Sequence, residues 1–185
     1  MIRLLSRSLR VTVSAVAVGL VTALVPGTAQ AAPYCGQVWG SLPESDLRMD
    51  VDAIDGVRAG RHACFDRLVV DVHGDVGGYD VRYVPQVVQD GSGVPVPLRG
   101  GAFLQVVVRN PVVDRLGHVH WAPTRPAELV DVRGWTTFRQ VAYAGCFEGQ
   151  TTVGVGVRAR LPFRVLALDG PGDGSRLVID VGHRW

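Results

Sequence analysis

The sequence contains no lysine. All 19 of its basic residues are arginines, and they are balanced by 17 acidic residues, so the formal net charge is only +2. A balance this small gives no reason to expect a polyanionic partner, and we expect no binding to nucleic acid. Methionine occurs only twice and glutamine is sparse. This shortage of helix-forming side chains argues against a helical protein.

No hydrophobic run is long enough to span a membrane. The longest, residues 11–25, covers about 15 residues, whereas a transmembrane helix needs about 20. It follows a basic stretch with Arg3, Arg7 and Arg10, and it precedes Ala29-Gln30-Ala31, which matches a signal-peptidase site. We predict that residues 1–31 are a cleaved secretory signal peptide. The mature chain then has 16 arginines against 17 acids, a net charge of minus one, and no membrane anchor.

Cysteine is also scarce, and no C-x-x-C pair occurs among Cys35, Cys64 and Cys146. In an exported chain, three cysteines indicate one disulfide and one remaining thiol. We favour Cys35 with Cys64, because residues 34–44 have little periodicity and a covalent bond would order them; Cys64 with Cys146 is a close alternative. We expect no lipid on Cys35, since Tyr34 is too bulky for the residue beside a lipid attachment site.

What is abundant is valine, with glycine and proline every few residues, a composition typical of strands joined by turns. We predict an all-β fold, a single β-sandwich of about eight strands over residues 51–185. It follows an N-terminal extension at 32–50, and we expect no second domain. The predicted strands are alternating or continuous apolar runs at 65–73, 79–84, 102–109, 127–132, 135–143, 151–158, 163–168 and 177–181.

One short internal echo is present. The sequence DRLVVDV at 66–72 returns as SRLVIDV at 175–181. In an extended strand Leu68 faces one side and Arg67 the other, and the second copy sorts in the same way. We predict two equivalent strands with apolar sides in the core and arginines on an outer face. The echo is compatible with a two-fold pseudo-symmetric sandwich.

The motifs for metal binding are incomplete. His118 and His120 have a spacing that can chelate a metal ion, but no third ligand is evident nearby. The acidic run that starts at Asp50 resembles a calcium loop, but Arg61 stands where the bidentate glutamate is needed. We therefore expect no metal site and no cofactor.

The motifs for catalysis are equally weak. No G-x-S-x-G nucleophile motif occurs, and Ser92 lies between two glycines in a predicted hairpin turn. A secreted hydrolase of cell wall or glycan remains an alternative. It would use Cys146 with a histidine base, or Asp66 and Glu148 as an acid and base pair. We expect no catalytic residues.

Arginines recur between acidic and phenylalanine residues, and they have two possible roles. Paired across exposed strands, they would stabilise the fold by at most about 1 kcal/mol each. Alternatively, they form a ligand-binding face, and we predict that this face includes Arg67, Arg164 and Arg176. Guanidinium groups bind carboxylates in a bidentate manner, and carboxylates are plentiful in the stem peptides of bacterial cell wall. Aromatic rings would stack on sugars.

Four segments in this order resemble the AMIN-like domain of exported actinobacterial proteins: 60–71 (GRHACFDRLVVD), 145–152 (GCFEGQTT), 161–165 (LPFRV) and 175–181 (SRLVIDV). The resemblance covers 51–185. It implies a β-sandwich similar to the AMIN domain, which localises certain cell-wall amidases and secretins by binding peptidoglycan, and it implies no catalytic residues.

Together, these observations predict a non-enzymatic protein that is secreted, extracellular or cell-wall associated. Its expected partner is peptidoglycan or another cell-envelope component. Besides the hydrolase, a second alternative is an envelope protein–protein interaction module that uses exposed sheet edges.

Overall fold

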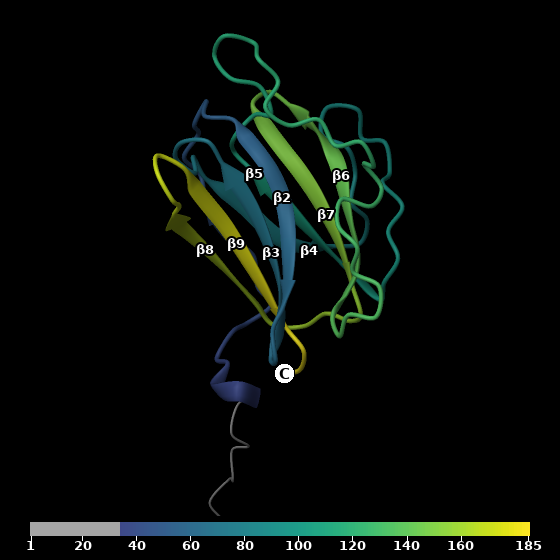
Figure 1. The fold of residues 1–185 in the computed structure, drawn as a ribbon. Coiled ribbons are helices and arrows are strands. Elements are labelled where there is room, and N and C mark those ends of the chain that lie inside the picture. The colour runs from purple at the N-terminus through teal and green to yellow at the C-terminus, as the bar shows by residue number, and fades with distance from the viewer. Residues whose placement is uncertain (1–33) are drawn as a thin grey trace, which may run out of the picture. The chain divides into compact units, whose positions relative to one another are not determined.

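A computed structural model describes residues 34–185, and the predicted signal peptide at 1–31 lies outside this range. Within it, nine strands form two antiparallel sheets, preceded by a short 3-10 helix, η1 (Tyr34–Gly36) (Figure 1). The predicted all-β sandwich is confirmed. The strands are β1 (Glu44–Asp46), β2 (Ile54–Arg61), β3 (Phe65–Val72), β4 (Tyr79–Val84), β5 (Ala102–Val108), β6 (Phe138–Phe147), β7 (Gln150–Val157), β8 (Phe163–Asp169) and β9 (Ser175–Gly182).

The four-stranded sheet has the order β2-β3-β9-β8, and the five-stranded sheet has the order β1-β4-β5-β7-β6. Alternation along each strand decides which side chains enter the core. On β3, Leu68 and Val70 are fully buried against the other sheet, as are Leu177 and Ile179 on β9. Each such side chain contributes about 1.5–3 kcal/mol through removal from water. No helix among residues 34–185 is long and apolar enough to cross a membrane.

The two echoed segments are β3 and β9, and they are hydrogen-bonded neighbours in the middle of the four-stranded sheet. Their antiparallel register pairs Arg67 with Asp180 and Asp71 with Arg176. The repeated arginine and aspartate therefore meet across the strands with opposite charges. The two copies of the repeated sequence lie side by side in one sheet. The repeat therefore relates two neighbouring strands and does not relate one sheet to the other.

The outer face of the five-stranded sheet is covered by the chain itself. On β7, valines at 153, 155 and 157 point into the core, whereas Gly154 and Gly156 lie on the opposite side. Leu98 lies directly on Gly154, where an added Cβ would be 2.9 Å from its Cδ1 atom, and the Arg99 carbonyl oxygen lies against Gly156. The two glycines thus let residues 85–101 pack onto the sheet.

The N-terminal extension packs on both sheets. A disulfide joins Cys35 to Cys64 in the turn after β2, so the favoured pairing is confirmed and Cys146 is a free thiol. Farther on, the Gly40 carbonyl accepts a hydrogen bond of 2.7 Å from the Phe163 amide of β8. The extension then supplies β1, the edge strand that pairs with β4.

The strand prediction was wrong for residues 127–132, for β1 and for β2. Residues 127–132 are not a strand: the segment 126–132 shares only two backbone hydrogen bonds with β6, one from the Tyr143 amide to the Pro126 carbonyl and one from the Leu129 amide to the Val141 carbonyl. Pro126 interrupts pairing because it has no amide hydrogen to donate. Conversely, no pattern predicted the short strand β1 or the strand β2, whose glycines, arginines and half-buried side chains lack a regular apolar alternation.

Candidate functional site

Arg67 and Arg164, two of the three predicted ligand-binding residues, share one buried carboxylate. Arg67 on β3, Asp180 on β9 and Arg164 on β8 stand in register across the outer face of the four-stranded sheet. Arg67 donates to both Asp180 oxygens, with Nε–Oδ1 at 2.6 Å and Nη2–Oδ2 at 2.8 Å. Arg164 binds Oδ2 through Nε and Nη2, both at 2.9 Å. Two cations on one anion leave a local charge of +1.

The two arginines are neither buried nor free. The Asp180 side chain is 0% exposed, whereas those of Arg67 and Arg164 are 27% and 38% exposed. Their hydrogen bonds fix the guanidinium planes, and the bond to Asp180 raises the pKa of Arg67 above its already high ordinary value. The outward part of each guanidinium is therefore a preorganised positive surface.

Aromatic rings surround this pair of arginines. The Arg164 guanidinium carbon lies 4.5 Å from the centroid of the Trp39 ring, and that of Arg67 lies 5.2 Å from the Phe65 centroid. His62 stacks on Phe65 with ring centroids 4.4 Å apart, and Trp39 meets Phe65 edge-on at 5.6 Å. We call these five residues the arginine–aromatic surface. Sequence reasoning omitted Trp39 and His62, which the Cys35–Cys64 disulfide holds near β3.

Arg176, the third predicted residue, lies apart from this surface. It is four residues from Asp180 along β9, which corresponds to about 13 Å. Its Nη2 atom donates to the Asp169 carbonyl oxygen at 2.8 Å. The structure therefore brings two of the three predicted arginines together and places the third near the opposite end of the sheet.

The carboxylate pair proposed for a hydrolase is not assembled. Asp66 is fully buried, where its Oδ2 atom accepts from the backbone amides of Thr137 and Phe138 at 2.7 and 3.0 Å. Its Oδ1 atom lies 3.1 Å from Nε2 of His183. Glu148 follows the other end of the ten-residue strand β6, so about 30 Å separates it from Asp66. That exceeds the separation of an acid and base pair on a glycosidic bond.

In the part of the chain that the structure describes, no histidine lines the cavity at the Cys146 thiol. Cys146 lines this shallow cavity with Tyr143, Phe147 and the turn that contains Gly91. Ser92, the other residue weighed as a nucleophile, lines the same cavity, where its hydroxyl donates to Gln89 at 3.1 Å. Neither arrangement activates a nucleophile.

The histidines weighed as metal ligands lie in the loop between β5 and β6. Both contact Asp114: Nδ1 of His118 lies 2.9 Å from its Oδ2 atom, and Nε2 of His120 lies 3.5 Å from the same oxygen. Hydrogen bonds, first from the His118 backbone amide, lower the pKa of Asp114 to about 2. His120 also meets Asp55, at 3.0 Å between Nδ1 and Oδ1, and this bond raises the pKa of His120.

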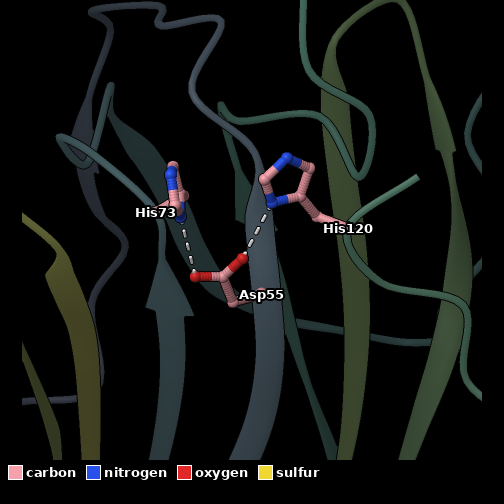
Figure 2. A group of neighbouring side chains, drawn as sticks. All are labelled: Asp55, His73 and His120. Carbon is pink, nitrogen blue, oxygen red and sulfur yellow. Dashed lines mark hydrogen bonds and ion pairs between the residues drawn. The ribbon is translucent and has the colours of Figure 1, made fainter. Parts of the chain in front are cut away.

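A second histidine reaches the same aspartate. Nδ1 of His73, at the end of β3, lies 3.5 Å from Oδ2 of Asp55 (Figure 2). The structure thus supplies partners for His120 that sequence reasoning missed, because they are 47 and 65 residues distant along the chain.

A family model for the AMIN-like domain matches residues 52–183. The chain belongs to the AMIN-like domain family. No curated protein and no solved structure shows a significant match. The AMIN-like domain is a binding-type domain related to the cell envelope, and the disulfide of this member is typical of extracellular proteins. The match includes Arg67, Arg164 and Asp180, whereas Trp39 and Cys35 lie in the segment before it.

Proposed function

We propose that this AMIN-like protein is secreted by an actinobacterial cell and acts as a non-enzymatic binding module, most simply for peptidoglycan. The arginine–aromatic surface is the proposed contact, with Arg176 extending it along β9. The observation that carries the proposal is the shared carboxylate of Asp180. It holds two guanidinium groups in fixed positions without neutralising both.

The chemistry of the surface suits an anionic glycopeptide. A guanidinium has five N–H donors, and Arg67 and Arg164 each use only Nε and Nη2 on Asp180. The remaining N–H groups can donate to a carboxylate of a stem peptide. The half-buried ring of Trp39 and the exposed ring of His62 add apolar faces against which a sugar can stack.

The function is tested by retention of the purified protein on actinobacterial sacculi at low and moderate salt. We expect wild type to be retained and Arg164→Gln and Trp39→Ala to lose most of the retained fraction. Arg67→Gln and Arg176→Ala should weaken retention as well, the latter less because it is distant. The matched control is Arg133→Ala, which should be retained like wild type. Arg133 is an exposed arginine of the β5–β6 loop and forms an ion pair with Asp131. Retention of wild type no better than that of an unrelated folded protein would refute wall binding.

Two further arms separate the ligands. Amidation of the stem-peptide carboxylates should abolish retention if those groups are the ligand. Protease treatment of the sacculi before the assay should leave it unchanged. Retention that depends on protease-sensitive material would instead identify an envelope protein as the partner.

A further inference from the structure

The three side chains of Asp55, His73 and His120 converge from separate parts of the fold (Figure 2). Asp55 is the extra residue of a β-bulge in β2, where the register with β3 shifts between Ile54 and Gly56. His73 directly follows β3, and its backbone amide is fixed by a 2.8 Å hydrogen bond to the Ala53 carbonyl. His120 belongs to the β5–β6 loop, where its amide donates to the Val112 carbonyl at 3.0 Å.

We propose that these three residues bind a divalent transition-metal ion such as Zn²⁺. One donor atom from each lies within 4.8 Å of the other two. A tetrahedral zinc site with bonds of 2.0–2.1 Å separates neighbouring donors by about 3.4 Å. The existing Asp55–His120 and Asp55–His73 distances of 3.0 and 3.5 Å are on this scale, so small side-chain rotations complete the site.

The donor set selects the class of metal. Two imidazoles and one carboxylate suit zinc and its neighbours in the first transition row, whereas magnesium and calcium prefer oxygen ligands alone. Three protein ligands leave one position for water or for an outside ligand. His73 and His120 line a shallow surface cavity with Asp114, so an ion and its fourth ligand can enter from solvent.

Asp114 has the position of an outer-shell group. Nε2 of His120 faces its Oδ2 atom at 3.5 Å, while Nδ1 of the same ring faces Asp55. Asp114 is itself held by the backbone amides of Leu116 and His118, at 2.8 and 2.9 Å from Oδ1. A carboxylate behind a histidine ligand fixes the ring and its tautomer, an arrangement that metal-binding histidines usually have. Asp114 is therefore a positioning residue.

Asp55 has no arginine partner among residues 34–185, a property that it shares with Asp66 and Asp114. Ion pairs of Asp46, Asp71, Asp131 and Asp180 all involve arginine, whereas Asp55 meets only histidines among residues 34–185. A carboxylate without an arginine partner is available for a cation. The metal would connect β2 and β3 of one sheet to the loop that follows β5 of the other.

Calorimetric titration of the purified protein with ZnCl₂, in a buffer that does not chelate metals, tests this proposal. We expect one Zn²⁺ per chain and a rise in the melting temperature. His73→Ala, His120→Ala and Asp55→Asn should each weaken binding by more than about tenfold. Asp114→Asn should weaken it by about tenfold, as loss of an outer-shell partner does. The control variant His62→Ala removes an exposed histidine outside the cluster. It should bind Zn²⁺ as wild type does.

A second measurement needs no variant. Co²⁺ bound to wild type should give the visible absorption of a four-coordinate ion, and Zn²⁺ should displace it stoichiometrically. The proposal is wrong if millimolar Zn²⁺ does not bind. It is also wrong if the His73→Ala/His120→Ala double variant binds as wild type does, or if His62→Ala loses as much affinity as the cluster variants.

Discussion

At the scale of single residues, ionised groups in this protein act in two distinct ways. Asp66 and Asp180 are fully buried and accept several hydrogen bonds each, so they fix the positions of other groups. Asp131 and Arg133 form an ion pair in the β5–β6 loop that is open to water. The buried carboxylates should therefore affect the free energy of unfolding. The exposed pair should mainly affect the pKa of its own aspartate.

Asp66→Asn should lower the free energy of unfolding by about 1–3 kcal/mol, because its single amide oxygen can accept from the backbone amides of Thr137 and Phe138 or face the His183 ring, whereas the carboxylate does both. Urea unfolding followed by tryptophan fluorescence measures the loss. Asp131→Asn is the control and should leave the unfolding midpoint nearly unchanged. Equal midpoints for Asp66→Asn and wild type would contradict the structural role of Asp66.

The pKa of Asp131 is lowered to about 2, chiefly by the side-chain hydrogen bond from Arg133. Because the folded pKa lies below the ordinary 3.8, the stabilisation from this group is complete above pH 3.8 and is lost as the pH falls toward 2. NMR titration of the Asp131 side chain should give the lowered value. Arg133→Ala should return it toward 3.8, and an unchanged value would exclude Arg133 as the cause.

At the scale of elements, β7 shows how one strand serves two packing surfaces. Its valines face the core, and its glycines at 154 and 156 receive the segment at 85–101. Neither glycine has a positive φ, so close approach and not backbone conformation requires them. The destabilisation caused by an alanine at either position therefore depends on which atoms its Cβ contacts.

Gly156→Ala should destabilise the protein by about 1–3 kcal/mol, because its Cβ would meet the rigid backbone carbonyl of Arg99. Gly154→Ala should cost less, since its Cβ would meet the ends of the Leu98 and Val87 side chains and no backbone atom. Thermal unfolding compares the two with Gly56→Ala, where a Cβ has open space. Equal losses for Gly154→Ala and Gly156→Ala would argue against this packing.

At the scale of the whole molecule, the Cys35–Cys64 disulfide attaches the N-terminal extension to the turn between β2 and β3. The extension in turn places Trp39 over Arg164. One covalent bond thus contributes both to stability and to the proposed binding surface. Breaking it should affect the two properties together.

The Cys35→Ser/Cys64→Ser variant should lose about 3–4 kcal/mol of unfolding free energy, as the chain-entropy model gives for a loop closed over 29 residues. Its retention on sacculi should also fall, even at temperatures where the sandwich remains folded by circular dichroism. Cys146→Ser should change neither. Full retention by the variant that lacks the disulfide would show that the disulfide-held position of the extension is not needed for binding to sacculi.

The sequence predicted features that depend on local pattern. Leu68 and Val70 alternate with Arg67 on one strand, so the strand and its buried side follow directly from period two. The pairing of β3 with β9 and the convergence of Arg67 and Arg164 depend on register between distant strands, which no local pattern encodes. His120 illustrates this limit: its neighbour His118 is visible in the sequence, whereas Asp55 and His73 reach it only through the fold.

The two ends of the described unit lie close together. The guanidinium of Arg184 sits 5.4 Å from the ring of Tyr34, and the amide of His183 donates to the Cys64 carbonyl. A purification tag or reporter fused after Trp185 would therefore begin two residues beyond the contact of His183 with the Cys64 turn, and it would obstruct the access of a large ligand to the arginine–aromatic surface. The tight turn at 170–174 lies at the opposite end of β9 and is the better site for such a fusion.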